Sequence, residues 1–249
     1  MEFLLGFVIA VLIGLTGVGG GSVTAPALVL FLGVGPAESV GTALLFTAIV
    51  KLVAAPVYIA RKQVNFRILW LMLAGGMPGV LAGSYLLARL RAGQHRGPLF
   101  AVLGATIILM AMLNLYRLFA PRRSASAQDR TRWLPWIAVP IGAEVGFSSA
   151  GAGAVGALVL MTLSQISIAQ VVGTDVLFGL GLSLGGGGIS LGMGNYHGVL
   201  ALKLAAGGVV GALVGAQLLS VLPPRPLRVA LSLWLVSMGG QLCWRAVTG

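Results

Sequence analysis

Two glycine-rich segments carry the residue types best suited to binding an ion. The first lies between apolar arms at 3–15 and 23–33, and the second lies between apolar arms at 134–147 and 154–164. The arms are about 17–21 Å long as helices, shorter than a bilayer core of about 30 Å, so two broken or re-entrant helices are predicted. Free N–H groups where the second arms begin, expected at Ser22 and Ala154, favour an anion. The candidate substrate-binding residues in these breaks are Thr16, Gly19, Gly20, Gly21, Ser22, Thr24, Ser148, Ser149, Gly151 and Gly153.

Four ionisable residues lie within apolar segments, where a charge is costly unless it is paired or hydrated. Lys203 is close enough to a segment end to reach the interface. Glu144, just before the second break, is a candidate carrier of a coupling proton, or a carboxylate bonded to the backbone of the break. Lys51 and Asp175 are predicted to approach and neutralise each other; alternatively, Lys51 holds the anion.

The elements that position these groups must span a membrane. The chain has 249 residues, of which 58% are hydrophobic and 8% charged, too few charges for a soluble domain and too apolar for disorder. A single cysteine excludes a disulfide scaffold, and no metal site is expected. Unbroken spans are predicted at 37–60, 66–88, 97–119, 168–192, 197–221 and 226–247.

An internal repeat organises the chain into two halves. Residues 14–87 align without a gap to 146–219 at an offset of 132, with Val40-Gly41-Thr42 matching Val172-Gly173-Thr174. The glycines at spacing four from Gly75 are expected only to allow close helix packing. The domains are predicted as a first transmembrane repeat (1–119), a basic linker (120–132) and a second repeat (133–249).

Basic residues indicate how the halves face. If each broken helix is a hairpin, the halves are inverted and ten Lys or Arg residues face the cytoplasm against four outside; full crossings would make the halves parallel, with nine against five. The inverted arrangement is favoured, with both termini extracytoplasmic. The ten residues are Arg61, Lys62, Arg67, Arg117, Arg122, Arg123, Arg130, Arg132, Arg225 and Arg228.

Three spaced blocks resemble the TauE/SafE sulfite exporter family, also called the toluene sulfonate uptake permease family. They are Gly17-Val-Gly-Gly-Gly-x4-Pro26, Ser39-Val-Gly-Thr42 and Gly75-Gly76-x2-Gly79-x3-Gly83. The resemblance implies an inner-membrane transporter of sulfite or small organosulfonates, mostly outward, with no cofactor. The second half departs from the pattern, with Ala152 and Leu158 in place of Gly20 and Pro26.

The sequence therefore predicts an all-α polytopic membrane protein with two pseudo-symmetric, inverted repeats. It is expected to be a secondary transporter that exports a small sulfur-containing anion by alternating access. The alternatives are a proton-coupled importer of sulfonate, thiosulfate or another small solute, and an anion channel. An intramembrane enzyme is disfavoured because the sequence lacks a paired Ser/Lys or Asp/Asp motif and a His-rich metal cluster. The expected partners are the anionic substrate, the bilayer and a second copy of the chain, with no nucleic acid.

Overall fold

The computed structural model describes residues 2–16, 20–92, 96–119, 130–150, 152–218 and 224–248, and these residues form only helices and their connections. The helices of the first half are α1 (Glu2–Thr16), α2 (Gly20–Phe31), α3 (Pro36–Ala60), α4 (Phe66–Ala92) and α5 (Arg96–Phe119). Those of the second half are η1 (Thr131–Trp133), α6 (Leu134–Ser148), α7 (Ala152–Leu163), α8 (Ile168–Gly192), α9 (Gly198–Leu218) and α10 (Pro224–Thr248). The all-α prediction is confirmed.

Local sequence explains where the two central helices begin. Pro36 is the first residue of α3, where its missing N–H costs nothing because no intrahelical acceptor exists. The α8 helix begins after a capping box in which Ser167 Oγ accepts the N–H of Gln170 at 3.3 Å and the Gln170 side chain accepts the Ser167 N–H. Both helices then run for 25 residues.

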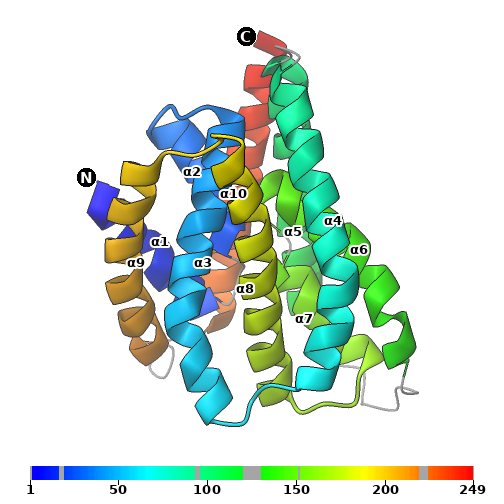
Figure 1. Cartoon of the computed structure of the whole chain (residues 1–249). Helices are drawn as coiled ribbons and strands as arrows, with labels where there is room; N and C mark the ends of the chain where they lie inside the picture. Colours follow the sequence, from blue (N-terminus) through cyan, green and yellow to red (C-terminus); the bar gives the residue numbers. More distant parts are fainter. Residues whose placement is uncertain are drawn as a thin grey trace.

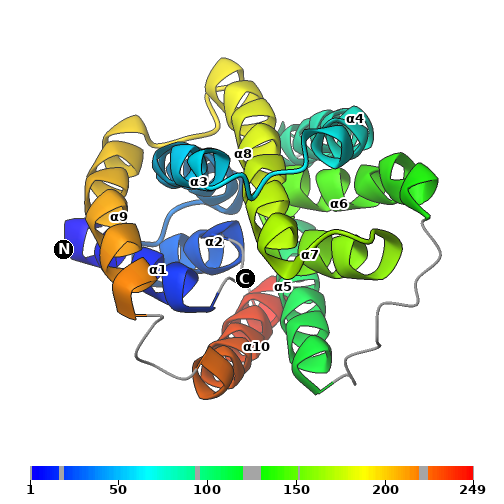
Figure 2. The same cartoon turned by 90° about the horizontal axis from the view of Figure 1, so that it is seen from below.

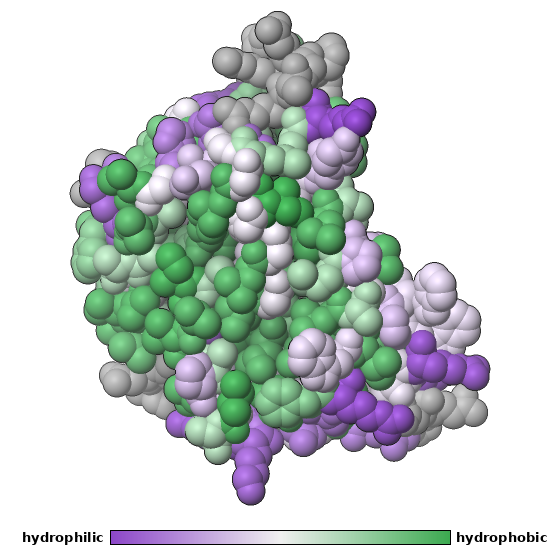
Figure 3. All heavy atoms as spheres, in the orientation of Figure 1, coloured by the Kyte–Doolittle hydropathy of each residue, from purple (hydrophilic) through white to green (hydrophobic). Residues whose placement is uncertain are grey.

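Four helical stretches among the described residues are long and apolar enough to cross a membrane. They are α3, Phe66–Leu90 of α4, Leu99–Tyr116 of α5, and α8. The α1 and α2 helices are apolar but shorter. The face of the molecule in Figure 3 is largely hydrophobic across its middle, with hydrophilic residues gathered towards the upper and lower ends. This distribution is that of a protein whose sides contact lipid.

The α3 and α8 helices lie side by side at the centre and run in opposite directions (Figures 1 and 2). At the upper end in Figure 1, the His197 N–H beyond α8 donates to Thr42 Oγ1 near the start of α3, at 3.0 Å. At the lower end, the Asn65 N–H beyond α3 donates to Thr174 Oγ1 near the start of α8, also at 3.0 Å. We call these ends the upper face and the lower face.

The helices of each half pack mainly against the other half. The most extensive contacts join α4 to α6, α1 to α9, and α5 to α10. Glycines allow two of these pairs to approach to backbone contact, because a Cβ on Gly75 would overlap the carbonyl oxygen of Pro135 and one on Gly207 would overlap that of Phe3. The packing role expected for Gly75 agrees with this approach. The two halves therefore interlock through their outer helices as well as at the centre.

Most of the predicted linker, residues 120–129, lies outside the described residues. Its last part is described: Arg130 precedes η1, and its N–H donates to the carbonyl oxygen of Leu163 at the end of α7, at 3.1 Å. The start of α6 and the end of α7 therefore lie on the same face of the molecule.

Candidate functional site

The described helices end and begin on either side of each predicted break, with α1 ending at Thr16 and α6 ending at Ser148. The α2 helix begins at Gly20 and α7 at Ala152, each two residues earlier than expected. The helices begin earlier than expected because a first helical turn tolerates glycine. The N–H groups of that turn have no acceptor within the helix, so residues of low helix propensity can occupy it. Ser149 caps the C-terminus of α6 in the left-handed region at φ 59°, and its N–H donates to the Val145 carbonyl oxygen at 2.8 Å.

Each pair of short helices enters and leaves on one face. Glu2 at the start of α1 and Leu32 beyond α2 line one upper-face cavity. The hydrogen bond from Arg130 to Leu163 joins the corresponding ends of α6 and α7 at the lower face. We call these units the α1–α2 hairpin and the α6–α7 hairpin.

The two breaks contact each other inside the molecule. A Cβ on Gly21 would overlap the carbonyl oxygen of Ser149 and would also meet Ser149 Oγ. Gly20, Gly21, Ser22 and Thr24 are all buried, as are Ser148 and Ser149. The start of α2, where the positive end of the helix dipole lies, is therefore buried beside the hydroxyl groups of Ser148 and Ser149, as expected for an anion site.

Some of the predicted hydroxyl donors are already engaged within the chain. Thr24 Oγ1 donates to the Gly20 carbonyl oxygen at 2.7 Å. Ser148 Oγ donates to Glu144 Oε1 at 2.6 Å and accepts the N–H of Ala150 at 3.2 Å. The hydroxyl protons of these two residues are therefore used locally, and their oxygens can act only as acceptors there.

Two other buried hydroxyls, Thr47 Oγ1 and Ser149 Oγ, have no hydrogen-bond partner among the described residues. Thr47 was not among the residues predicted from sequence. It lies on α3, and its Oγ1 would be 2.9 Å from a Cβ on Gly20. The signal that could have identified it is a hydroxyl in the middle of a long apolar helix, because a buried polar group requires a partner.

The deep charges lie on different helices. Asp175 of α8 is 7% exposed, and its carboxylate packs against Gly156 of α7. Lys51 lies on α3. Lys51 follows Thr47 by one helical turn, so both occupy the same face of α3. Glu144 has one carboxylate oxygen, Oε2, that is buried without a partner in the described part of the chain.

Some of the predicted site residues remain untested. The side chain of Thr16 and the residues Gly19 and Gly151 lie outside what the structure describes. Gly153 is buried in the first turn of α7. Lys203 lies far from the breaks; its Nζ is 2.8 Å from Glu2 Oε2 in an exposed ion pair, consistent with the expectation that it reaches the interface.

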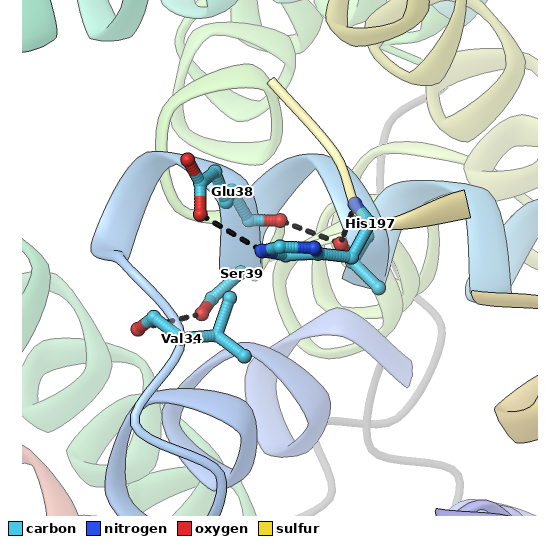
Figure 4. A network of polar contacts seen from close by, with 5 residues as sticks. Val34, Glu38, Ser39 and His197 are labelled. Atoms are coloured by element: carbon cyan, nitrogen blue, oxygen red, sulfur yellow. Dashed lines mark hydrogen bonds and ion pairs between the residues drawn. The ribbon is translucent and has the colours of Figure 1, made fainter. Parts of the chain in front are cut away.

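The upper face carries an additional polar network beside the central helices (Figure 4). His197 Nε2 lies 3.0 Å from Glu38 Oε2, and Ser39 Oγ donates to the Val34 carbonyl oxygen at 3.3 Å. A cavity of about 630 Å³ adjoins this network, and its lining includes Glu2, Tyr196 and His197. A smaller cavity of about 210 Å³ lies at the lower face beside Asn65 and Arg67.

Apolar helices long enough to span a membrane, joined to a buried polar centre, define a polytopic membrane protein. Residues 2–242 match the family described as Sulfite exporter TauE/SafE, and the chain belongs to this family. It is therefore a multi-pass membrane transporter and not an enzyme. The resemblance found in the sequence is confirmed.

Similar curated proteins carry names that agree with this assignment. The chain is 30% identical to a probable membrane transporter protein, YjnA, of Bacillus subtilis, covering 94% of this chain and 96% of that protein. It is 28% identical to YdhB of the same organism, covering 91% and 93%, and 25% identical to a probable membrane transporter protein of Haemophilus influenzae, covering 87% and 83%. No solved structure matches the chain significantly.

Proposed function

We propose that the protein exports a small sulfur-containing oxyanion, sulfite or an organosulfonate, by alternating access across the bacterial inner membrane. The observation that carries this proposal is the start of α2, which is buried inside the molecule and adjoins the second break. Helix N-termini meeting at mid-depth favour an anion without a fixed cation. The family description supplies the sulfur oxyanion as the expected substrate.

We further propose that the two halves are inverted structural repeats. Adding 132 to the first residue of α1, α2, α3 or α4 yields the first residue of α6, α7, α8 or α9. The contacts are reciprocal at the same offset: Thr42 with His197 and Thr174 with Asn65. Such exchange of partners is expected of a two-fold axis, and antiparallel α3 and α8 favour an axis in the membrane plane.

In this arrangement the lower face is cytoplasmic and both termini are outside. The lower face carries the connection with Arg61 and Lys62 together with Arg130 and Arg132 before α6. Cytoplasmic loops are enriched in Lys and Arg. An inside-negative potential then drives an anion outwards, so export requires no coupling ion.

A proton-coupled importer is the second candidate, and Glu144 is the residue that favours it. Its partly unsatisfied carboxyl lies one helical turn before the break, where it could take up and release a proton as the site opens to either side. Whether the protein exports or imports, the proposed Lys51–Asp175 pair would neutralise two charges that lie deep in the membrane. An anion channel, the remaining alternative, would show flux that does not saturate.

The test is flux in proteoliposomes loaded with sulfite, sulfate, thiosulfate or taurine, with and without imposed proton gradients and membrane potentials. An exporter moves sulfite along its electrical gradient with saturable kinetics and no proton requirement. Dependence on a proton gradient, lost in Glu144→Gln but retained in the upper-face control Glu38→Gln, would select the importer. Absence of flux for every sulfur oxyanion would reject both.

A further inference from the structure

We propose that the anion binds at only one of the two breaks, at the start of α2, with the hydroxyls of Thr47 and Ser149 as its side-chain ligands. This inference rests on the proposed transport of an oxyanion and specifies where in the pseudo-symmetric centre it binds. Both hydroxyls are more than nine-tenths buried, at 5% and 6% exposure. Neither has a partner in the described part of the chain.

The two hydroxyls approach consecutive residues of the first turn of α2. Thr47 Oγ1 lies 2.9 Å from the point where a Cβ on Gly20 would be. Ser149 Oγ lies against the point where a Cβ on Gly21 would be. The glycines allow this approach because they have no side chain. The backbone of α2 at Gly20 and Gly21, the hydroxyl of Thr47 on α3 and the hydroxyl of Ser149 just after α6 therefore lie close together and can converge on one small oxyanion.

The corresponding surroundings of α7 lack these donors. At the offset of 132, Thr47 corresponds to Gly179, which has no side chain, and Gly20 corresponds to Ala152. An oxyanion at the start of α7 would have no hydroxyl from α8 at the position that Thr47 occupies on α3. The donor set is therefore present on one side of the pseudo-symmetric centre.

A carboxylate further disfavours an anion at α7. Asp175 packs against Gly156, in the fifth position of that helix. Its counterpart on α3 is Ala43, and the counterpart of Gly156 on α2 is Thr24, so no carboxylate occupies the same place beside α2. The Asp175 carboxylate occupies the space beside Gly156 and would oppose a second anion close to α7.

The experiment measures binding of radiolabelled sulfite to the purified full-length protein, with flux in proteoliposomes as a second readout. The wild type is expected to bind one sulfite per chain. Thr47→Val keeps the shape and removes the hydroxyl, so it is expected to weaken all binding and raise the KM for sulfite about 10-fold or more. Thr47→Ser, which restores the hydroxyl, is expected to remain within about threefold of the wild type.

The matched control is Thr162→Val on α7, whose hydroxyl donates to the carbonyls of its own helix and which should bind sulfite as the wild type does. If Thr47→Val does not fold, Ser149→Ala provides the same test from the other break. Two sulfites per chain, or wild-type binding by both Thr47→Val and Ser149→Ala, would overturn the one-site inference and leave the transporter proposal standing. A wild type that neither binds nor transports any sulfur oxyanion would instead overturn the proposed function and the inference with it.

Discussion

The α1–α2 and α6–α7 hairpins each join a helix of 15 residues to a helix of 12 residues. Their backbones are matched in length, but their polar surroundings differ. The second half pairs Gly156 with the carboxylate of Asp175, where the first half has Thr24 and Ala43. The proposed repeat would therefore extend to the backbone, whereas the distribution of charge and hydroxyl groups differs between the two hairpins. An alternating-access transporter could use similar backbones for movement and different side chains for binding.

Gly21→Ala should produce the largest change, because it separates the two hairpins where they touch. The added Cβ would overlap the Ser149 carbonyl oxygen, and a backbone group can yield only if a helix shifts. We expect a loss of more than about 3 kcal/mol in the free energy of unfolding, together with loss of transport. The measurement is SDS titration in mixed micelles. Gly188→Ala on α8, where nothing lies within 4 Å of a Cβ, should be neutral or stabilising.

Removing one member of the Lys51–Asp175 pair should have the next largest effect, since it leaves the other charge within the apolar interior. Lys51→Met or Asp175→Asn is expected to lower the free energy of unfolding by about 3 kcal/mol, and the double variant by less than the sum of both. A double-mutant cycle measures this coupling. The exposed pair of Lys203 and Glu2 serves as the control and should show no coupling. Strict additivity at Lys51 and Asp175 would contradict the proposed neutralisation.

Thr42→Val and Thr174→Val test whether the two faces are equivalent in backbone pairing. Each removes the acceptor of an interhelical N–H, from His197 in one case and Asn65 in the other. We expect similar losses of about 1–2 kcal/mol in unfolding free energy for the two variants. Thr106→Val on α5, which loses only a bond within its own helix, is the matched control. Unequal losses would argue against reciprocal packing.

The smallest effect is expected from replacing His197, which forms an exposed pair with Glu38 on the upper face. His197→Asn places on the upper face the residue type that Asn65 supplies on the lower face, and it removes the contact with Glu38. The His197 side chain is 52% exposed, so solvent screens the pair and the loss should stay below about 1 kcal/mol. Thermal unfolding at low and high salt measures it. A larger loss that persists at high salt would show that the pair does more than join the two elements.

Segment positions could be predicted closely because a membrane helix requires a long apolar run between polar connections. The prediction of 168–192 coincides with α8, and 37–60 differs from α3 by one residue. The starts of the short helices were placed two residues late, at Ser22 and Ala154. Glycines were taken as helix-breaking, whereas a first helical turn tolerates them. Glu144 and Asp175 could be selected because buried carboxylates are rare in such segments.

By itself, the sequence determined that the chain is a helical membrane protein, where its helices are interrupted, and which charges lie deep. Those properties follow from composition and from runs of neighbouring residues. Only the tertiary structure decided that Thr47 faces Gly20, that Gly21 meets Ser149, and that Asp175 packs against Gly156. The physical reason is that these helices are apolar on nearly every side, because lipid and protein interior are both apolar. Hydrophobic periodicity therefore cannot reveal which face of each helix points inwards, and that orientation is set by packing between distant segments.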